Sequence, residues 1–327
     1  MEMRKLMMAA PIALAMGASA MSAAHATDKV TLMFDWLPSG LHGAWYAGMT
    51  NGCLAEQNLE VSLERGFGGV DTVAKVASGV TDLGMADLGT VMMAGQREHA
   101  PVKALFPVYN ESPMAVAIMS DSGIKTLKDL EGRSLASAPG DSTVVMLPLA
   151  MKETGADFSK VGRMSADVSA LFGLLMQGKT DAITTFMTTG NILQGIASSS
   201  GKQLDLIHFG ADLDIYGSAI FANEKFIQSK PDVVARVVKA GECIYEKARE
   251  NLGSSVDALM AAFPTKKRPN EQAAAEAGLD LVFDNATYRE HGFSWDMAKV
   301  QSTFEKSLEA QGLPVSGHGA DYVVKQP

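Results

Sequence analysis

The segment from residue 30 to residue 66 constrains the fold of this chain more than any other, because it predicts a strand, a loop, a helix and a second strand in close succession. The apolar run 30–34 has the length of a buried strand, and residues 59–63 alternate between apolar and polar side chains. Between them, apolar residues recur every three or four positions over 41–54, which predicts a helix interrupted at Asn51 and Gly52. A loop between a strand and a helix lies at the carboxyl edge of a sheet, where open α/β sheets bind ligands.

That loop concentrates polar and aromatic side chains. The candidate ligand contacts in and just after it are Asp35, Trp36, Ser39, His42 and Trp45. Aromatic faces combined with polar groups predict a pocket for a small ring compound. Two alternatives stay open: the tryptophans could instead anchor the hydrophobic core, and His42 could hydrogen-bond to neighbouring backbone.

Strands and helices alternate along the chain as far as residue 221, which predicts the α/β class. A chain of roughly 300 residues exceeds the usual size of a single core, so two lobes are expected. We expect the apolar runs 113–119 and 215–221 to cross between these lobes, with hinge residues near 119–120 and 214–217. From Pro231 onward the pattern is helical, with apolar stripes that begin at Val233 and at Trp295.

Further candidate ligand contacts follow the ends of the other predicted strands. They are Asp87, Thr90, Asn110, Glu111, Asp141, Ser142, Thr143, Phe186 and Tyr216. Residues 87–90 are expected to form a loop. Asp87 and Asp141 each have helix capping as an alternative role. The free backbone N–H groups and hydroxyls at Ser142 and Thr143 could hold an acceptor atom of a ligand.

Residues 1–26 have the pattern of an export signal. Arg4 and Lys5 form a basic start, residues 7–16 form an apolar core, and Ala24 and Ala26 predict cleavage after Ala26. No other stretch is apolar enough to cross a membrane. The sequence therefore predicts a freely soluble, periplasmic protein.

Charge and motifs exclude several classes of function. Removal of residues 1–26 leaves 26 basic and 36 acidic residues, a net charge of −10, which argues against nucleic acid or an anionic membrane as partner. The six histidines show no metal-ligand spacing, and no nucleophile motif is present, so we expect no metal, no cofactor and no enzymatic activity. Cys53 and Cys243 fall on apolar helical faces and are expected to be buried thiols rather than a disulfide.

Three motifs resemble one family. The opening D-W-L-P-S-G-L-H, residues 35–42, resembles that of periplasmic solute-binding proteins of ABC importers, in the branch that binds pyrimidine precursors of thiamine and is related to nitrate, sulfonate and taurine binders. Residues 77–84 and 178–182 are similar to the A-x-G-x-x-D-x-G and G-x-x-D-A patterns of that branch, whereas Ser39 stands where the branch usually has Asn.

The resemblance implies a two-lobed α/β fold, the type II periplasmic-binding-protein fold, with two crossing strands as its hinge. Its expected division is a signal peptide at 1–26, the first part of lobe 1 at 27–118, lobe 2 at 119–214, and the return to lobe 1 with C-terminal helices at 215–327. It further implies a monomer that closes around a small-molecule ligand and docks on a membrane permease.

The predicted cleft loops carry aromatic and acidic residues but neither Arg nor Lys, which disfavours an inorganic or sulfonate anion. An amino-substituted heterocycle suits this composition, and a formylamino- or hydroxymethyl-pyrimidine is the first choice by resemblance. An aromatic carboxylate at the Ser142–Thr143 helix end is the alternative ligand. The alternative from another class is a pyrimidine-precursor synthase, although the family's enzymes carry a cysteine-rich run that this chain lacks.

Overall fold

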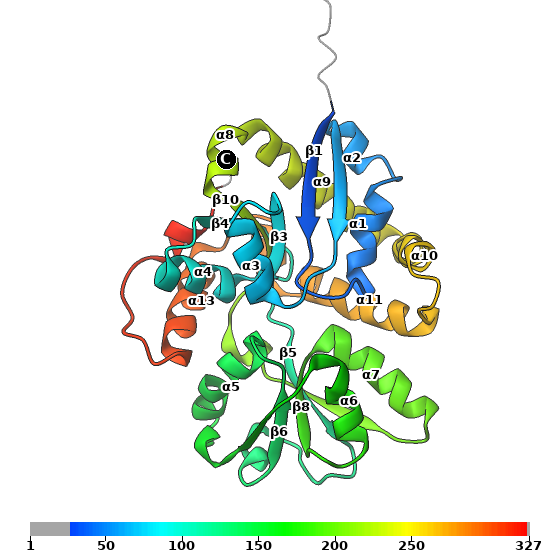
Figure 1. Ribbon diagram of the computed structural model, residues 1–327, viewed down its shortest axis with the longest axis vertical. Coiled ribbons are helices and arrows are strands. Elements are labelled where there is room, and N and C mark those ends of the chain that lie inside the picture. Colours follow the sequence, from blue (N-terminus) through cyan, green and yellow to red (C-terminus); the bar gives the residue numbers. More distant parts are fainter. Residues whose placement is uncertain (1–26, 326–327) are drawn as a thin grey trace, which may run out of the picture.

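The computed structural model describes residues 27–325, so the expected signal peptide at 1–26 lies outside the described residues. Within that range ten strands form two five-stranded sheets (Figure 1). The first sheet has the order β2 (Leu59–Glu64), β1 (Asp28–Met33), β3 (Leu83–Asp87), β10 (Ser218–Asn223), β4 (Val102–Pro107). The second has the order β7 (Gly162–Ser165), β6 (Ser134–Ser137), β8 (Ala182–Phe186), β5 (Met114–Met119), β9 (Leu204–His208).

Each sheet mixes parallel and antiparallel strands in the same way. In the first, β1 pairs in parallel with β2 and β3, and β10 runs antiparallel to β3 and β4. In the second, β6 pairs in parallel with β7 and β8, and β5 runs antiparallel to β8 and β9. The carboxyl ends of β1 and β6 therefore occupy corresponding places in the two sheets.

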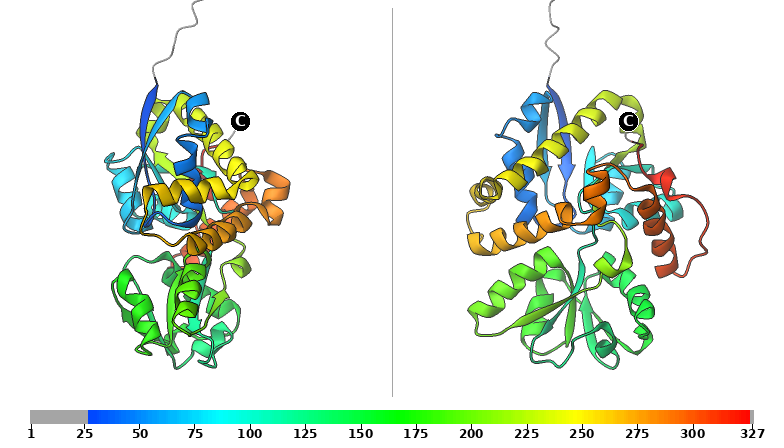
Figure 2. Two further views of the ribbon diagram at one scale, coloured as in Figure 1. Left: turned by 90° about the vertical axis from the view of Figure 1, so that its right-hand side faces the viewer. Right: turned by 180° about the vertical axis from the view of Figure 1, so that it is seen from behind.

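Helices cover both faces of each sheet (Figures 1 and 2). The first sheet carries α1 (Gly43–Gly48), α2 (Cys53–Glu56), α3 (Gly69–Ala77), α4 (Leu88–Glu98), α8 (Glu224–Ser229), α9 (Pro231–Glu250), α10 (Leu252–Ala262), α11 (Arg268–Phe283), α12 (Ala286–His291) and α13 (Met297–Ala310). The second carries α5 (Ser142–Glu153), α6 (Val168–Met176) and α7 (Met187–Ser199). We call these two assemblies the large lobe and the small lobe.

The chain passes between the lobes twice, at residues 108–113 and 209–217. The run 113–119, expected to be the first crossing, is instead almost entirely β5, an interior strand of the small-lobe sheet between β8 and β9, so the expected boundary after residue 118 is wrong. An apolar strand buried on both faces has the same sequence pattern whether it crosses between lobes or lies at the centre of one. Of the run 215–221, expected to be the second crossing, only 215–217 belong to the crossing, because 218–221 are part of β10 in the large-lobe sheet.

The expected helical stripes mostly form core. Val233, Val237 and Tyr245 of α9 are buried in the large lobe. In α13, Val300 and Phe304 are buried, whereas Met297, the first residue of the helix and a member of the stripe expected from Trp295, is 41% exposed. No helix within residues 27–325 combines the length and the apolar character needed to span a bilayer.

Cys53 of α2 and Cys243 of α9 form a disulfide, which corrects the expectation of two free thiols. The two helices pack against each other, and the Cα atoms of the cysteines lie 5.7 Å apart despite a separation of 190 residues. Two apolar helical faces that carry one cysteine each predict burial but not contact between the faces. The disulfide connects the first βαβ unit of the large lobe to the helix that follows the second crossing.

Candidate functional site

A cavity of about 270 Å³ lies between the lobes, at the carboxyl ends of β1 and β6. Its large-lobe wall consists of Asp35, Trp36, Leu37, Ser39, His42, Met85 and Tyr109. Its small-lobe wall consists of Ala138, Pro139, Gly140, Asp141, Thr143, Val168, Ser169, Leu171, Phe172, Ile183, Thr184, Thr185, Phe186, Thr188, Thr189 and Leu193. The loop after the first strand lines this cavity, as its place at a sheet edge predicts.

A second chain segment holds the backbone of that loop. The N–H groups of Gly66 and Gly68 donate to the carbonyls of Trp36 and Asp35 at 3.2 and 2.8 Å. A Cβ atom on Gly66 would lie 2.0 Å from the carbonyl oxygen of Phe34, so no other residue fits there without displacing the loop. The turn that follows β2 thus holds the backbone of Asp35 and Trp36 in place.

The far end of the loop is held by α11. Gly40 donates its N–H to Glu271 Oε2 at 2.9 Å, and Lys266 Nζ lies 3.0 Å from the other oxygen of this buried carboxylate. Gly40 has φ +52°, and a Cβ at this position would lie 2.9 Å from Ala274 Cβ. The sequence position therefore requires glycine, both for its backbone conformation and for its contact with α11.

Asp35 has an almost buried carboxylate with little protein contact. Its side chain is 12% exposed, and the nearest cationic candidate is His42, whose Nε2 lies 3.7 Å from Asp35 Oδ1. Within residues 27–325 neither carboxylate oxygen accepts a hydrogen bond. A buried carboxylate that accepts no hydrogen bond is unfavourable, which makes Asp35 the strongest candidate for accepting a hydrogen bond from a ligand.

His42 is held by the turn that it closes with Ser39. Ser39 donates its backbone N–H to His42 Nδ1 at 3.1 Å, and His42 donates its own N–H to the Ser39 carbonyl at 3.1 Å. The imidazole packs on the Phe34 ring with centroids 4.5 Å apart. Nε2 is buried and has no hydrogen-bond partner in the described part of the chain. The backbone alternative for His42 therefore holds for Nδ1, and a ligand contact through Nε2 stays a prediction.

Tyr109 and Trp36 supply the aromatic surface of the large-lobe wall. Tyr109 is 5% exposed, and burial raises the pKa of its hydroxyl far above the usual value, so the group stays neutral. No residue of the described range hydrogen-bonds to this hydroxyl. Trp36 is half-buried in the loop itself.

In the small-lobe wall, Asp141 is already engaged. One carboxylate oxygen accepts from the N–H of Thr143 at 2.8 Å, and the other accepts from the Thr184 hydroxyl. Asp141 therefore caps α5 and ties it to β8. Thr143 is buried, and its hydroxyl has no hydrogen-bond partner within the described range. Phe186 lines the cavity at the end of β8, as expected.

The other candidates lie outside the cavity lining: Trp45, Asp87, Thr90, Asn110, Glu111, Ser142 and Tyr216. Trp45 is a core residue that donates its indole N–H to the Tyr245 hydroxyl at 3.0 Å. Asn110 is fully buried and donates to the Val282 carbonyl.

Asp87 ends β3 and caps α4, so residues 87–90 form a strand end and a helix start rather than the expected loop. One carboxylate oxygen accepts from the N–H of Thr90 at 3.3 Å, and the other is buried without a partner within residues 27–325. Burial raises the pKa of Asp87 to about 7, and the nearby charge of Asp35 adds to the effect.

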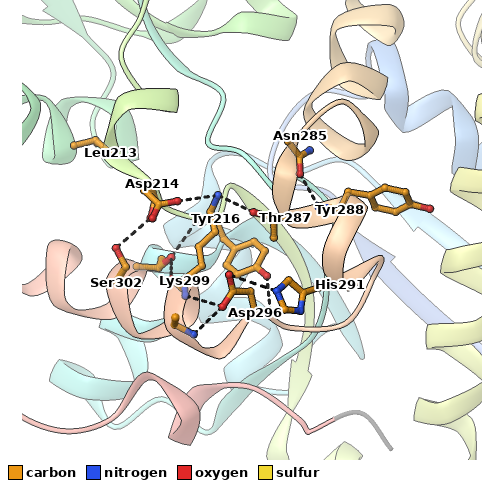
Figure 3. Close-up of polar contacts among 12 residues, drawn as sticks. Leu213, Asp214, Tyr216, Asn285, Thr287, Tyr288, His291, Asp296, Lys299 and Ser302 are labelled. Carbon is orange, nitrogen blue, oxygen red and sulfur yellow. Dashed lines mark hydrogen bonds and ion pairs between the residues drawn. The ribbon is translucent and has the colours of Figure 1, made fainter.

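Tyr216 packs against α13 instead of facing a ligand (Figure 3). Its hydroxyl accepts from the N–H of Asp296 at 2.9 Å, and its own N–H donates to the Thr303 hydroxyl at 3.0 Å. Nearby, Lys299 Nζ lies 3.3 Å from Asp214, which has φ +45°. These contacts fix the end of the second crossing to the large lobe.

Sequence reasoning missed most of the small-lobe wall, which α6, β8 and α7 supply. The signal that could have found it is the pair of Thr-Thr steps at 184–185 and 188–189, on either side of the end of β8. The lining contains neither Lys nor Arg. Among residues 27–325, no group of His, Cys, Asp and Glu side chains is arranged to hold a metal ion.

The family profile described as "NMT1/THI5 like" matches residues 40–251. The chain belongs to the NMT1/THI5-like family. It is 22% identical over 263 residues to the formylaminopyrimidine-binding protein of Halalkalibacterium halodurans, a match that covers 79% of this chain and 78% of that protein. It is 23% identical over 231 residues, 65% of each chain, to the 4-amino-5-hydroxymethyl-2-methylpyrimidine phosphate synthase THI13 of Saccharomyces cerevisiae.

Solved structures confirm the fold. The alkanesulfonate-binding protein SsuA of Xanthomonas axonopodis pv. citri superimposes with a TM-score of 0.70 at 14% identity, over 91% of this chain and 98% of that one. The periplasmic aliphatic sulphonate-binding protein SsuA of Escherichia coli gives a TM-score of 0.69 at 16% identity, over 90% and 97%. The predicted α/β periplasmic-binding-protein fold and the resemblance to ABC-importer binding proteins are both confirmed.

Proposed function

We propose that this protein is the substrate-binding component of an ABC importer and that it captures a small amino-substituted heterocycle, with a pyrimidine precursor of thiamine as first choice. The observation that carries the proposal is the cavity between the lobes, which combines a nearly buried carboxylate that accepts no hydrogen bond from the described residues, aromatic surface and neither Lys nor Arg. A ligand N–H group would give Asp35 the hydrogen bond that no described residue supplies.

The size of the cavity limits the ligand. At about 270 Å³ it lies just below the range typical of pockets for drug-sized molecules. One six-membered ring with a few short substituents suits this volume. The ring faces of such a ligand would stack on Trp36 or Tyr109, while hydroxyls of the small lobe reach its polar edge.

The charged groups of the cavity lining disfavour the alternative ligands relative to a pyrimidine. A sulfonate or nitrate needs guanidinium groups or a cluster of amides, and the lining has no Arg or Lys. An aromatic carboxylate at the start of α5 would meet Asp141, whose own carboxylate already occupies that helix end. The name of the H. halodurans relative agrees with a neutral pyrimidine.

Lobe closure would follow from the two-walled cavity. The crossings at 108–113 and 209–217 form the hinge in this proposal. Across the lobe interface, α5 and α13 contact through Lys152 with Glu309 at 2.8 Å and Lys306 with Glu153 at 3.5 Å. A ligand that touches both walls stabilises the closed arrangement by the contacts it gains there, and the closed form would dock on a permease.

Export to an oxidising compartment agrees with two independent features. The first is the predicted signal at 1–26, and the second is the Cys53–Cys243 disulfide, because reducing compartments keep such thiols free. We therefore propose a periplasmic location. A monomer is sufficient for the proposed role.

The yeast relatives keep a pyrimidine synthase as the second candidate function. The two functions differ in what happens to the ligand. A binding protein releases the bound pyrimidine unchanged on denaturation, whereas a synthase would alter or form it. Mass spectrometry of the released compound therefore distinguishes them.

The test of the proposed function is a thermal-shift and calorimetric screen of residues 27–327. The panel contains 4-amino-5-hydroxymethyl-2-methylpyrimidine, its formylamino counterpart, benzoate, taurine and nitrate. A pyrimidine that binds the folded state raises the melting temperature by mass action. A shift with benzoate or taurine and none with either pyrimidine would contradict the ligand class.

A further inference from the structure

We propose that Asp35 and His42 form a donor–acceptor pair that selects ligands carrying an exocyclic amine next to an unprotonated ring nitrogen. In this arrangement Asp35 accepts from the amine and His42 Nε2–H donates to the ring nitrogen. The inference rests on the proposed function and adds which atoms of the ligand the large lobe recognises.

The hydrogen bond from Ser39 fixes which nitrogen of His42 carries the proton. A backbone N–H can only donate, so His42 Nδ1, which receives the Ser39 N–H at 3.1 Å, must be the unprotonated nitrogen. In the neutral imidazole the proton then sits on Nε2. Nε2 is a buried atom without a partner within residues 27–325, and His42 belongs to the cavity lining, so Nε2–H is the donor that His42 has left for a ligand.

Asp35 presents the complementary acceptor beside that donor. Its Oδ1 lies 3.7 Å from His42 Nε2, beyond the distance at which the two groups would hydrogen-bond to each other. Neither carboxylate oxygen accepts a hydrogen bond from the described residues. A donor and an acceptor placed side by side can bind an acceptor and a donor on adjacent atoms of a ring, as an amide side chain does on the edge of adenine.

The pair is held from outside the cavity, Asp35 through its backbone and His42 through its ring. The Asp35 carbonyl accepts from Gly68 N–H at 2.8 Å, and the His42 ring is fixed by Ser39 and by the face of Phe34. Little conformational entropy is then lost when a ligand binds. A site with pre-set buried donors and acceptors discriminates strongly against ligands that leave them unpaired.

This geometry predicts a preference between two pyrimidines of nearly equal size. In the 4-amino compound, the amine faces Asp35 and the ring nitrogen faces His42. In its 4-oxo analogue, held in the same orientation, an oxygen faces the carboxylate and a ring N–H faces the imidazole N–H. Two attractive contacts become two repulsive ones, so we expect the 4-oxo analogue to bind at least about 100-fold more weakly.

The variants separate a ligand contact from a structural role. In His42→Gln, the terminal amide can replace the Nε2–H donor, whereas in His42→Asn the shorter side chain can replace only the Nδ1 acceptor for Ser39. If His42 hydrogen-bonds to the ligand, the His42→Gln variant should keep ligand affinity within about fivefold of wild type. The His42→Asn variant should then lose about 10- to 100-fold in affinity. If His42 only holds the turn, Asn is the variant that keeps affinity. Asp35→Asn should lose about 10- to 100-fold for the 4-amino compound and narrow its preference over the 4-oxo analogue.

The experiment is calorimetric titration of residues 27–327 and the three variants with 4-amino-5-hydroxymethyl-2-methylpyrimidine and its 4-oxo analogue, with circular dichroism to confirm folding. Wild-type preference for the amino compound together with rescue by His42→Gln supports the pair. Equal wild-type affinity for the two pyrimidines overturns the pair while leaving the proposed function in place, and this measurement does not depend on the variants folding. Absence of wild-type binding to any pyrimidine would instead contradict the proposed function.

Discussion

The two lobes place an aspartate in corresponding loops, and the two aspartates differ in one respect. Asp35 follows β1 and Asp141 follows β6, the strands that hold the same position in their sheets. Both oxygens of Asp141 accept hydrogen bonds from Thr143 and Thr184, whereas Asp35 accepts none within the described range. Residue type and position alone do not separate a ligand contact from a helix cap. The protein partners of each carboxylate do.

A second pair of aspartates shows where the lobes are truly alike. Asp82 precedes β3 and accepts from the N–H of Thr31 at 2.8 Å, and Asp181 precedes β8 and accepts from the N–H of Ser134 at 2.8 Å. These are the acidic residues of the two family-like motifs at 77–84 and 178–182. Both motifs therefore secure a strand at its start, far from the carboxyl ends that line the cavity. The two lobes thus share the hydrogen bond at the start of a strand, and they differ in the side chains at the cavity.

The largest combined effect on stability and ligand binding should come from breaking the long-range support of the Asp35 loop. Gly66→Ala places a Cβ against the Phe34 carbonyl, and we expect a loss of about 3 kcal/mol or more in stability together with loss of ligand binding. Gly173→Ala in α6 is the matched control in the small lobe, because its Cβ would meet only Gln177 at 3.8 Å. That variant should gain roughly 0.5–1 kcal/mol from helix propensity. Urea unfolding and calorimetry test both, and equal effects would contradict the contrast between the lobes.

The disulfide should stabilise one lobe more than the other. Replacing Cys53 and Cys243 by Ala is expected to cost about 2–5 kcal/mol, because it frees a long loop of the unfolded chain and leaves a packing defect between α2 and α9. Hydrogen exchange should quicken in β1 and β2 more than in β6 and β8. Equal loss of protection in both sheets would show that the lobes unfold as one unit.

Asp87 ends β3, whereas Phe186 ends β8, so the pH effect of this buried carboxyl group has no counterpart at the corresponding place in the small lobe. Burial raises the pKa of Asp87 to about 7 from its ordinary value of 3.8. Folding therefore favours the protonated form, and its contribution to stability is complete below pH 4, falls as the pH rises to 7, and is lost above that. The loss is of the order of 4 kcal/mol.

Asp87→Asn keeps a capping side chain and removes the charge. Its stability relative to wild type should thus increase between pH 4 and pH 7 and then level off. Thermal unfolding of the two proteins across this range measures the difference. A difference that does not change with pH would contradict the raised pKa.

The smallest effect is expected in the small-lobe wall. Thr184→Val removes one of the two partners of Asp141, so stability should fall by about 1 kcal/mol, and pyrimidine affinity should change by less than about fivefold. Asp35→Asn is the comparison in the large lobe, where the affinity loss should be larger. If Thr184→Val weakens binding more than Asp35→Asn does, the small-lobe wall holds the main specificity contacts.

Much of the fold followed from hydrophobic periodicity, because β1 and β8 contain short apolar runs and β2 alternates between apolar and polar residues. The place of the first crossing could not be predicted, since β5 is apolar on both faces in the interior of a sheet. The disulfide also escaped prediction, because it joins helices 190 residues apart. The two lobes share a topology without any visible repeat in the sequence.

The site was predictable where distinctive side chains cluster in one loop, as Asp35, Trp36 and His42 do. Trp45 and Tyr216 were assigned to the ligand because aromatic residues with polar tips look alike in sequence, whether the tip contacts a ligand or another core residue. The threonines of the small-lobe wall were missed for the opposite reason. A threonine in a strand is common, and only its place at the cavity distinguishes it.

All five strands of the small lobe come from one uninterrupted stretch, residues 114–208, and every small-lobe residue of the cavity wall lies within it. The large lobe is assembled from both ends of the chain and contains the disulfide. One wall of the cavity is therefore encoded by a single continuous segment of the chain. A gene segment for that stretch could be exchanged between relatives. Recombination at its two borders would replace the small-lobe wall of the cavity and leave the large-lobe wall and the disulfide unchanged.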